Sequence, residues 1–448
     1  MDNMIIALIL FAITYVLMLA FSKYRTYIAL ASGLIFLITG MLSFNENLIM
    51  SVPKLDELGN VVLDSLGNVQ MESAIIDFNV LLMIAGSMGL VQLFIESKMP
   101  DLLAEFIIKK VKNVQMAAVA LALFAGIISA FVDNVATVLM VAPIALQICK
   151  KLDTNPVPFI ISIAVSSNLQ GAATLVGDTT AIMLGGEAKM NFLDFFWYQG
   201  KPSIFFAVEL GAVASALILA FIFRKEKNPI PKQDSTTKVT DYVPTVLLLA
   251  MLVLLISASF IENKPDITNG LICCVLFAIG LVYNLIKYKN KDNIISALKA
   301  IDFETLGLLL GLFLMIGGIK EQGVIDAAAD LLAKLGGGNE FLLFTIIVWA
   351  SVLISAFIDN IPYVATMLPI ITGLGLNPTL LYFGLLSGAT LGGNCTPIGA
   401  SANITGTAIL RKAGYEVKNK DFFKIGIPFT LAAVISSYIY LWIVYGNH

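Results

Sequence analysis

Apolar segments close to the length of a membrane-spanning helix alternate with short polar connections along this chain. A helix needs about 20 mainly apolar residues to cross the hydrocarbon core of a bilayer. This pattern predicts an all-α polytopic membrane protein. Its ordinary spans are expected at 4–21, 26–42, 75–95, 202–223, 242–260, 268–286, 303–320 and 426–446. The N-terminal segment has neither a basic n-region nor a small-residue cleavage site, so we interpret it as a retained first span.

Two regions, 114–188 and 339–410, depart from the simple pattern. In each, an apolar run is interrupted at its centre by Asp-Asn, and a second run is interrupted by glycine, threonine and Asp or Asn. Polar, irregular backbone is tolerated at membrane depth only where protein or a watery cavity surrounds it. We therefore predict two re-entrant helical hairpins (114–149 and 339–373) and two broken transmembrane helices (155–188 and 377–410).

Four further segments of the chain are amphipathic or polar. The stretches 100–112 and 324–335 are expected to lie along the membrane interface. The charged segment 224–241 is interpreted as a linker, and the polar loop 43–74 as a small hairpin or irregular cap.

The two halves of the sequence repeat each other. In the same order, each contains IDF, SAF(V/I)DN, a proline, NP, a GA(A)TL-glycine run, DFF and a further proline. We infer an N-terminal repeat at 1–223 and a C-terminal repeat at 242–448. With one re-entrant hairpin, each half crosses the membrane five times, so the second repeat is predicted to be inverted.

The distribution of positive charge sets the orientation. With the N-terminus outside, 22 lysines and arginines fall on the cytoplasmic side and six fall outside, which satisfies the positive-inside rule. The linker 224–241 is then cytoplasmic. Inverted repeats with discontinuous helices are typical of secondary transporters, whose substrate site lies near the midplane.

Composition excludes several classes of function. The chain has 448 residues, of which 58% are hydrophobic and 13% charged, with a net charge of −3. Without a basic domain, a nucleic-acid partner is not expected. The four cysteines lack zinc-site spacing, and His448, the last residue, is the only histidine. Histidine catalysis and histidine metal sites are therefore excluded.

Asp133 and Asp359 are the strongest candidates for ion chemistry. Each lies inside an apolar stretch, where a charge costs at least about 2.5–3.5 kcal/mol. Asn134 and Asn360, which follow them, offer amide oxygens to an ion. The alternative is that each Asp-Asn pair only caps the second arm of a hairpin.

The interrupted helices supply the second group of candidates. Glycines free backbone carbonyls for a cation, and the helix that follows presents amides to an anion. The alternative is a kink that only packs two helices closely. Together, the candidate substrate- or ion-binding residues are Asp133, Asn134, Thr137, Thr174, Gly177, Asp178, Thr179, Asp359, Asn360, Thr390, Gly393, Asn394 and Thr396. Of these, a sodium ion would take its ligands from Asp133, Asn134, Asp178, Asp359, Asn360 and Asn394.

Two further features are ambiguous. Asp178 has Asn394 as its counterpart in the aligned sequences, so the two ion sites are expected to differ. Glu209, inside the span 202–223, fits a functional carboxylate and a helix-pairing carboxylate equally well.

The chain resembles the citrate-transporter-like branch of the ion transporter superfamily, which includes ArsB-type arsenite permeases, NhaD-type sodium/proton antiporters and the melanosomal P protein. The resemblance rests on SAFVDNVATVLMVAPI (129–144), SAFIDNIPYVATMLPI (355–370) and GATLGGNCTPIGASANI (388–404). The related divalent-anion/sodium symporters carry Ser-Asn-Thr at each hairpin tip. Here those positions read Asp133-Asn134-Val135 and Asp359-Asn360-Ile361. The resemblance implies a homodimer in which a transport domain moves against a scaffold domain.

These observations predict a secondary active transporter of a small ion, an organic anion or oxyanion, coupled to sodium or protons by an elevator-like mechanism. It is expected in a prokaryotic plasma membrane, without enzyme activity and with no cofactor other than sodium ions. Sodium/proton antiport and arsenite efflux are the alternatives within this class. An intramembrane aspartyl protease or an ion channel is the alternative from another class.

Overall fold

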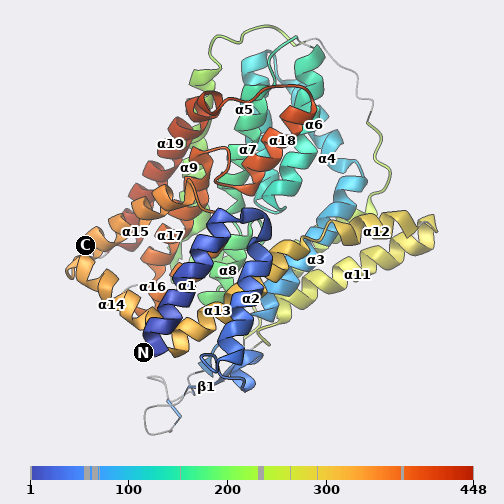
Figure 1. The fold of residues 1–448 in the computed structure, drawn as a ribbon. Coiled ribbons are helices and arrows are strands. Elements are labelled where there is room, and N and C mark those ends of the chain that lie inside the picture. The colour runs from blue at the N-terminus through green and yellow to red at the C-terminus, as the bar shows by residue number, and fades with distance from the viewer. Residues whose placement is uncertain are drawn as a thin grey trace.

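The computed structural model describes residues 3–54, 61–62, 69, 71–151, 153–230, 237–262, 264–289, 291–374 and 378–446. The described residues are almost entirely helical (Figure 1). In the first half the helices are α1 (Asn3–Ala20), α2 (Arg25–Ile38), α3 (Phe78–Glu96), α4 (Met99–Lys110), α5 (Val114–Ser129), α6 (Asn134–Lys151), α7 (Val157–Gly171), α8 (Thr179–Glu187) and α9 (Ile204–Ile222).

The second half of the chain is also helical. Its helices are α10 (Val243–Ala258), α11 (Thr268–Tyr288), α12 (Lys291–Lys299), α13 (Phe303–Glu321), α14 (Val324–Gly336), α15 (Glu340–Ser355), α16 (Asn360–Gly373), α17 (Pro378–Gly392), α18 (Ser401–Lys412) and α19 (Asn419–Tyr445). Short 3-10 turns lie at Ser22–Tyr24, Glu46–Leu48, Leu193–Phe195 and Gly393–Cys395. Two antiparallel pairs, β1 (Val52–Pro53) with β2 (Met71–Glu72) and β3 (Trp197–Tyr198) with β4 (Lys201–Pro202), complete the described elements.

The protein is an all-α polytopic membrane protein, as the apolar pattern predicts. Seven of the described helices are long and apolar enough to cross a membrane, or eight if α14 and α15, bent by 115°, form one span. Helices α2 and α10 are shorter than the spans predicted at 26–42 and 242–260. The repeated pieces of the loop 43–74 lie largely outside the described residues, as do 231–236 in the linker and 375–377, which include the first residue of the second predicted broken helix.

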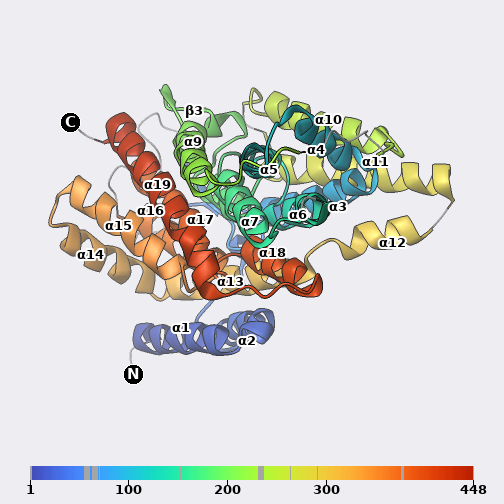
Figure 2. The same cartoon turned by 90° about the horizontal axis from the view of Figure 1, so that it is seen from above.

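The helices of the two halves exchange partners. Helix α2 packs on α13, and α11 packs on α3. Both crossings depend on a glycine. A Cβ on Gly311 would lie 2.4 Å from the backbone of Ala29, and a Cβ on Gly86 would lie 2.5 Å from the backbone of Cys273. In Figure 2, α2 lies at one edge of the molecule and α11 at another, and the interrupted helices α7 and α17 lie nearer the centre. The inversion of the second repeat stays a prediction.

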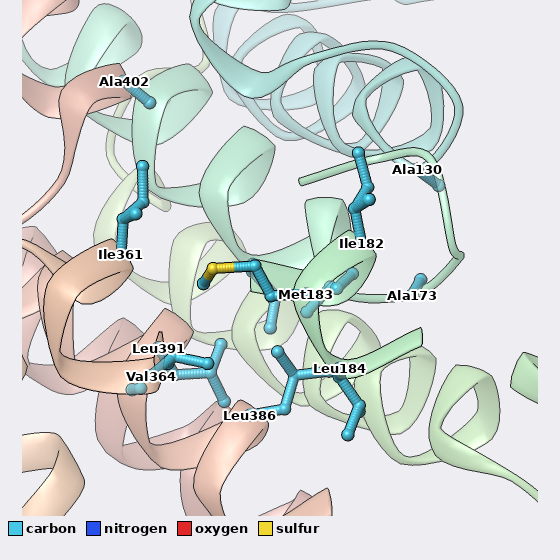
Figure 3. Close-up of a cluster of buried hydrophobic side chains, with 14 of the residues drawn as sticks. Ala130, Ala173, Ile182, Met183, Leu184, Ile361, Val364, Leu386, Leu391 and Ala402 are labelled. Carbon is cyan, nitrogen blue, oxygen red and sulfur yellow. The ribbon is translucent and has the colours of Figure 1, made fainter. Parts of the chain in front are cut away.

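Apolar side chains from both halves pack together beside the interrupted helices. Helix α8 contacts α16 and α17. Figure 3 shows Met183 and Leu184 of α8 facing Leu386 and Leu391 of α17, with Val364 of α16 beside them. These side chains are all buried. The two interrupted regions are therefore held against each other by a continuous apolar core.

At the end of the linker, Asp241 anchors the chain to the last turn of α11. Its buried carboxylate accepts hydrogen bonds from Val243 N–H (3.0 Å) and Tyr288 Oη (2.9 Å), and pairs with Lys287 at 2.9 Å. Burial alone would raise the pKa of Asp241, but these hydrogen bonds outweigh it, so the pKa is lowered. A lowered carboxylate pKa stabilises the folded state above the unfolded value of about 4, and this stabilisation is lost as the pH falls below it.

We therefore expect Asp241→Asn to lower the melting temperature in detergent at neutral pH. The difference from wild type should shrink as the pH falls below about 4. Fluorescence-detected unfolding at several pH values measures this. A difference that grows on acidification would contradict the assignment.

Candidate functional site

A cavity of about 640 Å³ lies where four helices begin. Asn134, Thr179, Asn360 and Ser401, which are the first residues of α6, α8, α16 and α18, all line it. Its other polar and charged lining residues are Gln92, Asp133, Asn168, Asp178, Ser296, Lys299, Asp302 and Thr305. The hairpin tips and interrupted helices predicted from the sequence therefore meet around one cavity.

Both hairpin-tip aspartates cap a helix. Asp133 Oδ1 accepts hydrogen bonds from the N–H groups of Val135 and Ala136, both at 3.0 Å, and Asp359 Oδ1 accepts one from Ile361 at 3.0 Å. Asp is a favoured capping residue because its carboxylate satisfies amides that have no partner within the helix. The capping role weighed in the sequence is thus present, and Asp133 also lines the cavity.

The two aspartates differ in their electrostatic partners. Arg25, at the start of α2, forms a salt bridge with Asp359. The hydroxyl of Tyr15 in α1 donates to the carbonyl of Pro362 at 2.6 Å, close to the same hairpin tip. Asp133 forms no salt bridge within the described part of the chain. From the sequence alone, Arg25 is predicted only to add to the positive charge on the cytoplasmic side, because nothing along the chain links it to residue 359.

Each interrupted helix is tied to the hairpin of its own half. Thr174 Oγ1 donates to the carbonyl of Ala130, and Thr396 Oγ1 donates to the carbonyl of Ala356. A Cβ on Gly177 would lie 2.5–2.8 Å from three carbonyl oxygens, including that of Ala130. A Cβ on Gly399 would meet three carbonyl oxygens at 2.6–2.9 Å, including that of Ala356.

These contacts correct the alignment of the two repeats. The sequence pairs Thr174 with Thr390 and Asp178 with Asn394, but the structure makes Thr174 equivalent to Thr396 and Gly177 equivalent to Gly399. By this register Asp178, just before α8, corresponds to Ala400, just before α18. The alignment follows the similar runs GAATL (171–175) and GATL (388–391), but the first begins at the last residue of α7 and continues into the interruption, whereas the second lies within α17.

Asn168 in α7 connects the two halves and was missed by the sequence analysis. Its Nδ2 donates to the carbonyl of Thr390 at 2.7 Å and to Asn394 Oδ1 at 3.1 Å, while its Oδ1 accepts from Asn134 Nδ2 at 3.1 Å. The side chain is fully buried. The sequence does contain a feature that could have pointed to Asn168. It belongs to the run SSNLQ (166–170), which is unusually polar for an apolar helix.

Only part of the predicted set reaches the cavity. Asp133, Asn134, Asp178, Thr179 and Asn360 line it. The other predicted residues do not line the cavity and are called supporting residues below. They are Thr137, Thr174, Gly177, Asp359, Thr390, Gly393, Asn394 and Thr396.

Of these supporting residues, Thr390 and Asn394 form hydrogen bonds in addition to those already described for Thr174, Thr396 and Asp359. Thr390 Oγ1 lies 3.1 Å from Thr180 Oγ1, and Asn394 Nδ2 donates to the carbonyl of Val165 at 2.9 Å. Gly393 packs against Gly399, whose carbonyl oxygen would lie 2.6 Å from a Cβ at residue 393. Within the described residues, no three His, Cys, Asp or Glu side chains form a metal-binding group. A cation here would therefore depend on amide, hydroxyl and backbone oxygens besides the carboxylates.

The charges around the cavity favour different ligands at its two interrupted helices. Asp178 precedes α8 and accepts a hydrogen bond from Thr180 Oγ1 at 2.8 Å. Its carboxylate, with that of Asp133, makes the first-half side suitable for a cation. Neither helix start has a hydrogen-bonded side-chain cap, but α18 has the uncharged Ala400 in the place of Asp178. An uncapped helix N-terminus attracts anions.

Comparison with known proteins identifies the family. The model of the citrate transporter family matches residues 6–379 and 270–448. The chain belongs to this family. Among the relatives of this chain, the "46 kDa membrane protein" of Mycobacterium leprae is 33% identical over 71% of this chain and 74% of its own length. The human P protein is 26% identical over 82% of this chain and 53% of its own length.

Two solved transporters have a similar fold. The YdaH transporter of Alcanivorax borkumensis gives a TM-score of 0.59 at 13% identity, covering 93% of this citrate-transporter-family chain and 98% of that chain. Neisseria gonorrhoeae MtrF, described as illuminating a class of antimetabolite efflux pumps, gives a TM-score of 0.56 at 15% identity and covers 94% and 96%. At this identity the likeness concerns the fold. The resemblance to citrate-transporter-like permeases noted in the sequence is confirmed, and the protein is a multi-pass membrane transporter.

Proposed function

We propose that this protein is a secondary active transporter of a small organic anion or oxyanion, driven by sodium ions or protons. The observation that carries the proposal is the convergence of four helix N-termini and the carboxylates of Asp133 and Asp178 on one cavity. Helix N-termini provide partial positive charge for an anion, and carboxylates provide negative charge for a cation. A site that binds both can couple their movement.

The coupling cation is assigned to Asp133 and Asp178. Both carboxylates line the cavity and belong to the same repeat. The anion is assigned to the starts of α16 and α18, where Asn360 and Ser401 reach the cavity. Asp359, which is neutralised by Arg25, supports the anion side without adding a free negative charge.

Alternating access is proposed to occur by an elevator-like movement of the hairpins and interrupted helices against a scaffold within a homodimer. The cavity extends to Lys299 and Asp302, beside the loop that the positive-inside count places in the cytoplasm. We therefore assign this conformation to the inward-facing state. The proposed location is a prokaryotic plasma membrane.

Sodium/proton antiport is the second candidate. It is favoured by the excess of negative charge in the cavity, where Asp133, Asp178 and Asp302 accompany a single lysine, Lys299. In this case the cations are themselves the cargo. Arsenite efflux, an intramembrane protease and a channel have no comparable observation in their favour.

Counterflow in proteoliposomes tests the proposal. Vesicles loaded with citrate, dicarboxylates or arsenite would be offered the same labelled compound outside, with sodium and pH varied in separate arms. We expect exchange of an organic anion or oxyanion that depends on sodium or pH. Sodium-dependent proton movement without any anion would instead support the antiporter. A leak without exchange, or no flux in any arm, would contradict carrier function.

A further inference from the structure

A membrane-embedded carboxylate outside the cavity, Glu209 in α9, has an unusual partner. Gln170 Nε2 donates to both carboxylate oxygens of Glu209, each at 3.0 Å. Glu209 forms no salt bridge within the described residues. The side-chain amide of Gln170 therefore donates to the carboxylate of Glu209, which is the only charged residue of the mainly apolar helix α9. An ionised carboxylate in such surroundings is costly unless it is neutralised.

The surroundings of Glu209 supply no neutralising charge. Helix α9 packs on α5, α7 and α19, and neither α5 nor α7 contains a charged residue, a tyrosine or a cysteine. The charged residues of α19 are Lys420, Asp421 and Lys424, all near its start. Gly211 packs against Ala433. Ser437 also donates to the carbonyl of Ala207, so Glu209 lies near the level of residue 435, and Lys424 is about three turns, or roughly 16 Å, along α19 from it.

The tyrosines of α19 are also engaged elsewhere. Tyr438 shares a hydrogen bond with Thr345 Oγ1, Tyr440 donates to the carbonyl of Pro202, and Tyr445 donates to the carbonyl of Tyr198. A proton is therefore the simplest means of neutralising Glu209.

Gln170 is suited to both protonation states of its partner. A primary amide has a donor face and an acceptor face. Its Nε2 serves the carboxylate, whereas its Oε1 is buried without a hydrogen-bond partner within the described structure. Rotating the amide by half a turn would present Oε1 to the O–H of a neutral carboxylic acid. Gly126 makes room for the amide, because a Cβ there would lie 1.5 Å from Gln170 Oε1.

Gln170 also connects Glu209 to the transport site. It is the penultimate residue of α7, and the interruption that follows leads to Asp178. A Cβ on the next residue, Gly171, would lie 3.2 Å from Asp178 Cβ. Only a short segment of chain therefore separates the amide of Gln170 from Asp178, the proposed coupling carboxylate.

We propose that Glu209 is a second proton-binding site, separate from the cavity, whose occupancy is transmitted by Gln170 to the interruption that carries Asp178. This deepens the proposed function and rests on it for the consequence in transport. The proton enters from water and leaves to water, and Glu209 alternates between acid and carboxylate.

Infrared difference spectroscopy of the purified protein in liposomes tests proton binding without knowledge of the substrate. We expect a carboxylic-acid C=O band that disappears as the pH is raised. It should be missing in Glu209→Gln and retained, at a shifted pH, in Glu209→Asp. The matched control is Glu96→Gln, because Glu96 also accepts from a glutamine, Gln92, at 3.1 Å but lies at the end of α3. Gly126→Ala, which displaces the amide of Gln170, should shift the pH at which the band disappears.

Transport assays give the second readout. Above its midpoint, a single proton site changes occupancy about tenfold per pH unit. We expect this pH dependence in wild type and Glu96→Gln, and less than about twofold variation per pH unit in Glu209→Gln. A wild-type spectrum without a titrating carboxylic-acid band, or a titrating spectrum that Glu209→Gln leaves unchanged, would overturn the proposal. Absence of any wild-type transport would instead contradict the proposed function, and the infrared titration would still decide the role of Glu209.

Discussion

Replacing Asp178 or Asp133 by asparagine is expected to lower the apparent affinity for the coupling cation by about 10- to 100-fold. This is the effect of losing one charged partner worth about 1.5–3 kcal/mol. Both carboxylates line the cavity, and the position equivalent to Asp178 in the other repeat is Ala400, which cannot replace it. Uptake in proteoliposomes as a function of sodium and pH measures the change.

Asp359→Asn provides the contrast. It leaves the guanidinium of Arg25 without its ion-pair partner, so we expect a lower transport rate or a changed substrate affinity with the cation dependence intact. Adding Arg25→Gln removes the unpaired charge, and the double variant should recover part of the loss, as residues in direct contact do in a double-mutant cycle. Insertion and folding are checked by size-exclusion chromatography.

Two outcomes would contradict the proposed division of roles between the repeats. The first is the loss of cation dependence in Asp359→Asn together with its retention in both first-half variants. Equal effects of all three substitutions would also contradict it, because the structure gives only Asp359 a positively charged partner among the three.

Gly177→Ala and Gly399→Ala are expected to reduce transport by about 100-fold while the protein still inserts in the membrane. Each new methyl group would lie within 3 Å of three backbone carbonyl oxygens, and backbone has little freedom to move away. The interrupted helix would shift relative to its hairpin tip, and displacements of about 1 Å at a binding site can cost 100-fold in rate. Gly393→Leu, which crowds the carbonyl of Gly399, should behave in the same way.

Gly373→Ala is the matched control. It also adds a methyl group to a glycine of the second repeat, but its only close neighbour among the described residues is a side chain, Ala329 Cβ, at 3.3 Å. We expect transport within about twofold of wild type, since substitutions away from tightly packed features change stability by less than about 0.5 kcal/mol. Wild-type transport by Gly177→Ala would mean that the interruption serves only as a packing kink.

The local features of the site could be predicted from the sequence because they depend on neighbours along the chain. An Asp-Asn pair at the centre of an apolar run interrupts a helix and caps the next one, and the structure has Asp133 and Asp359 doing so. In the same local way, Gly171 ends α7, and Gly177 and Asp178 directly precede the start of α8 at Thr179. The all-helical, multi-pass class followed from the lengths of the apolar runs, since a bilayer accepts helices whose backbone groups are internally satisfied.

The membrane class, the positions of the interrupted segments and the resemblance to citrate-transporter-like permeases can all be predicted from the sequence, because each depends on the order of residues over short distances. Which polar groups meet depends on the packing of whole helices. The tertiary structure paired Arg25 with Asp359, placed Asn168 between the two halves and made Ala400 the counterpart of Asp178. These partners lie on different helices, and their approach is set by the close packing of whole helices, such as the glycine crossings at Gly86 and Gly311, which no local pattern encodes.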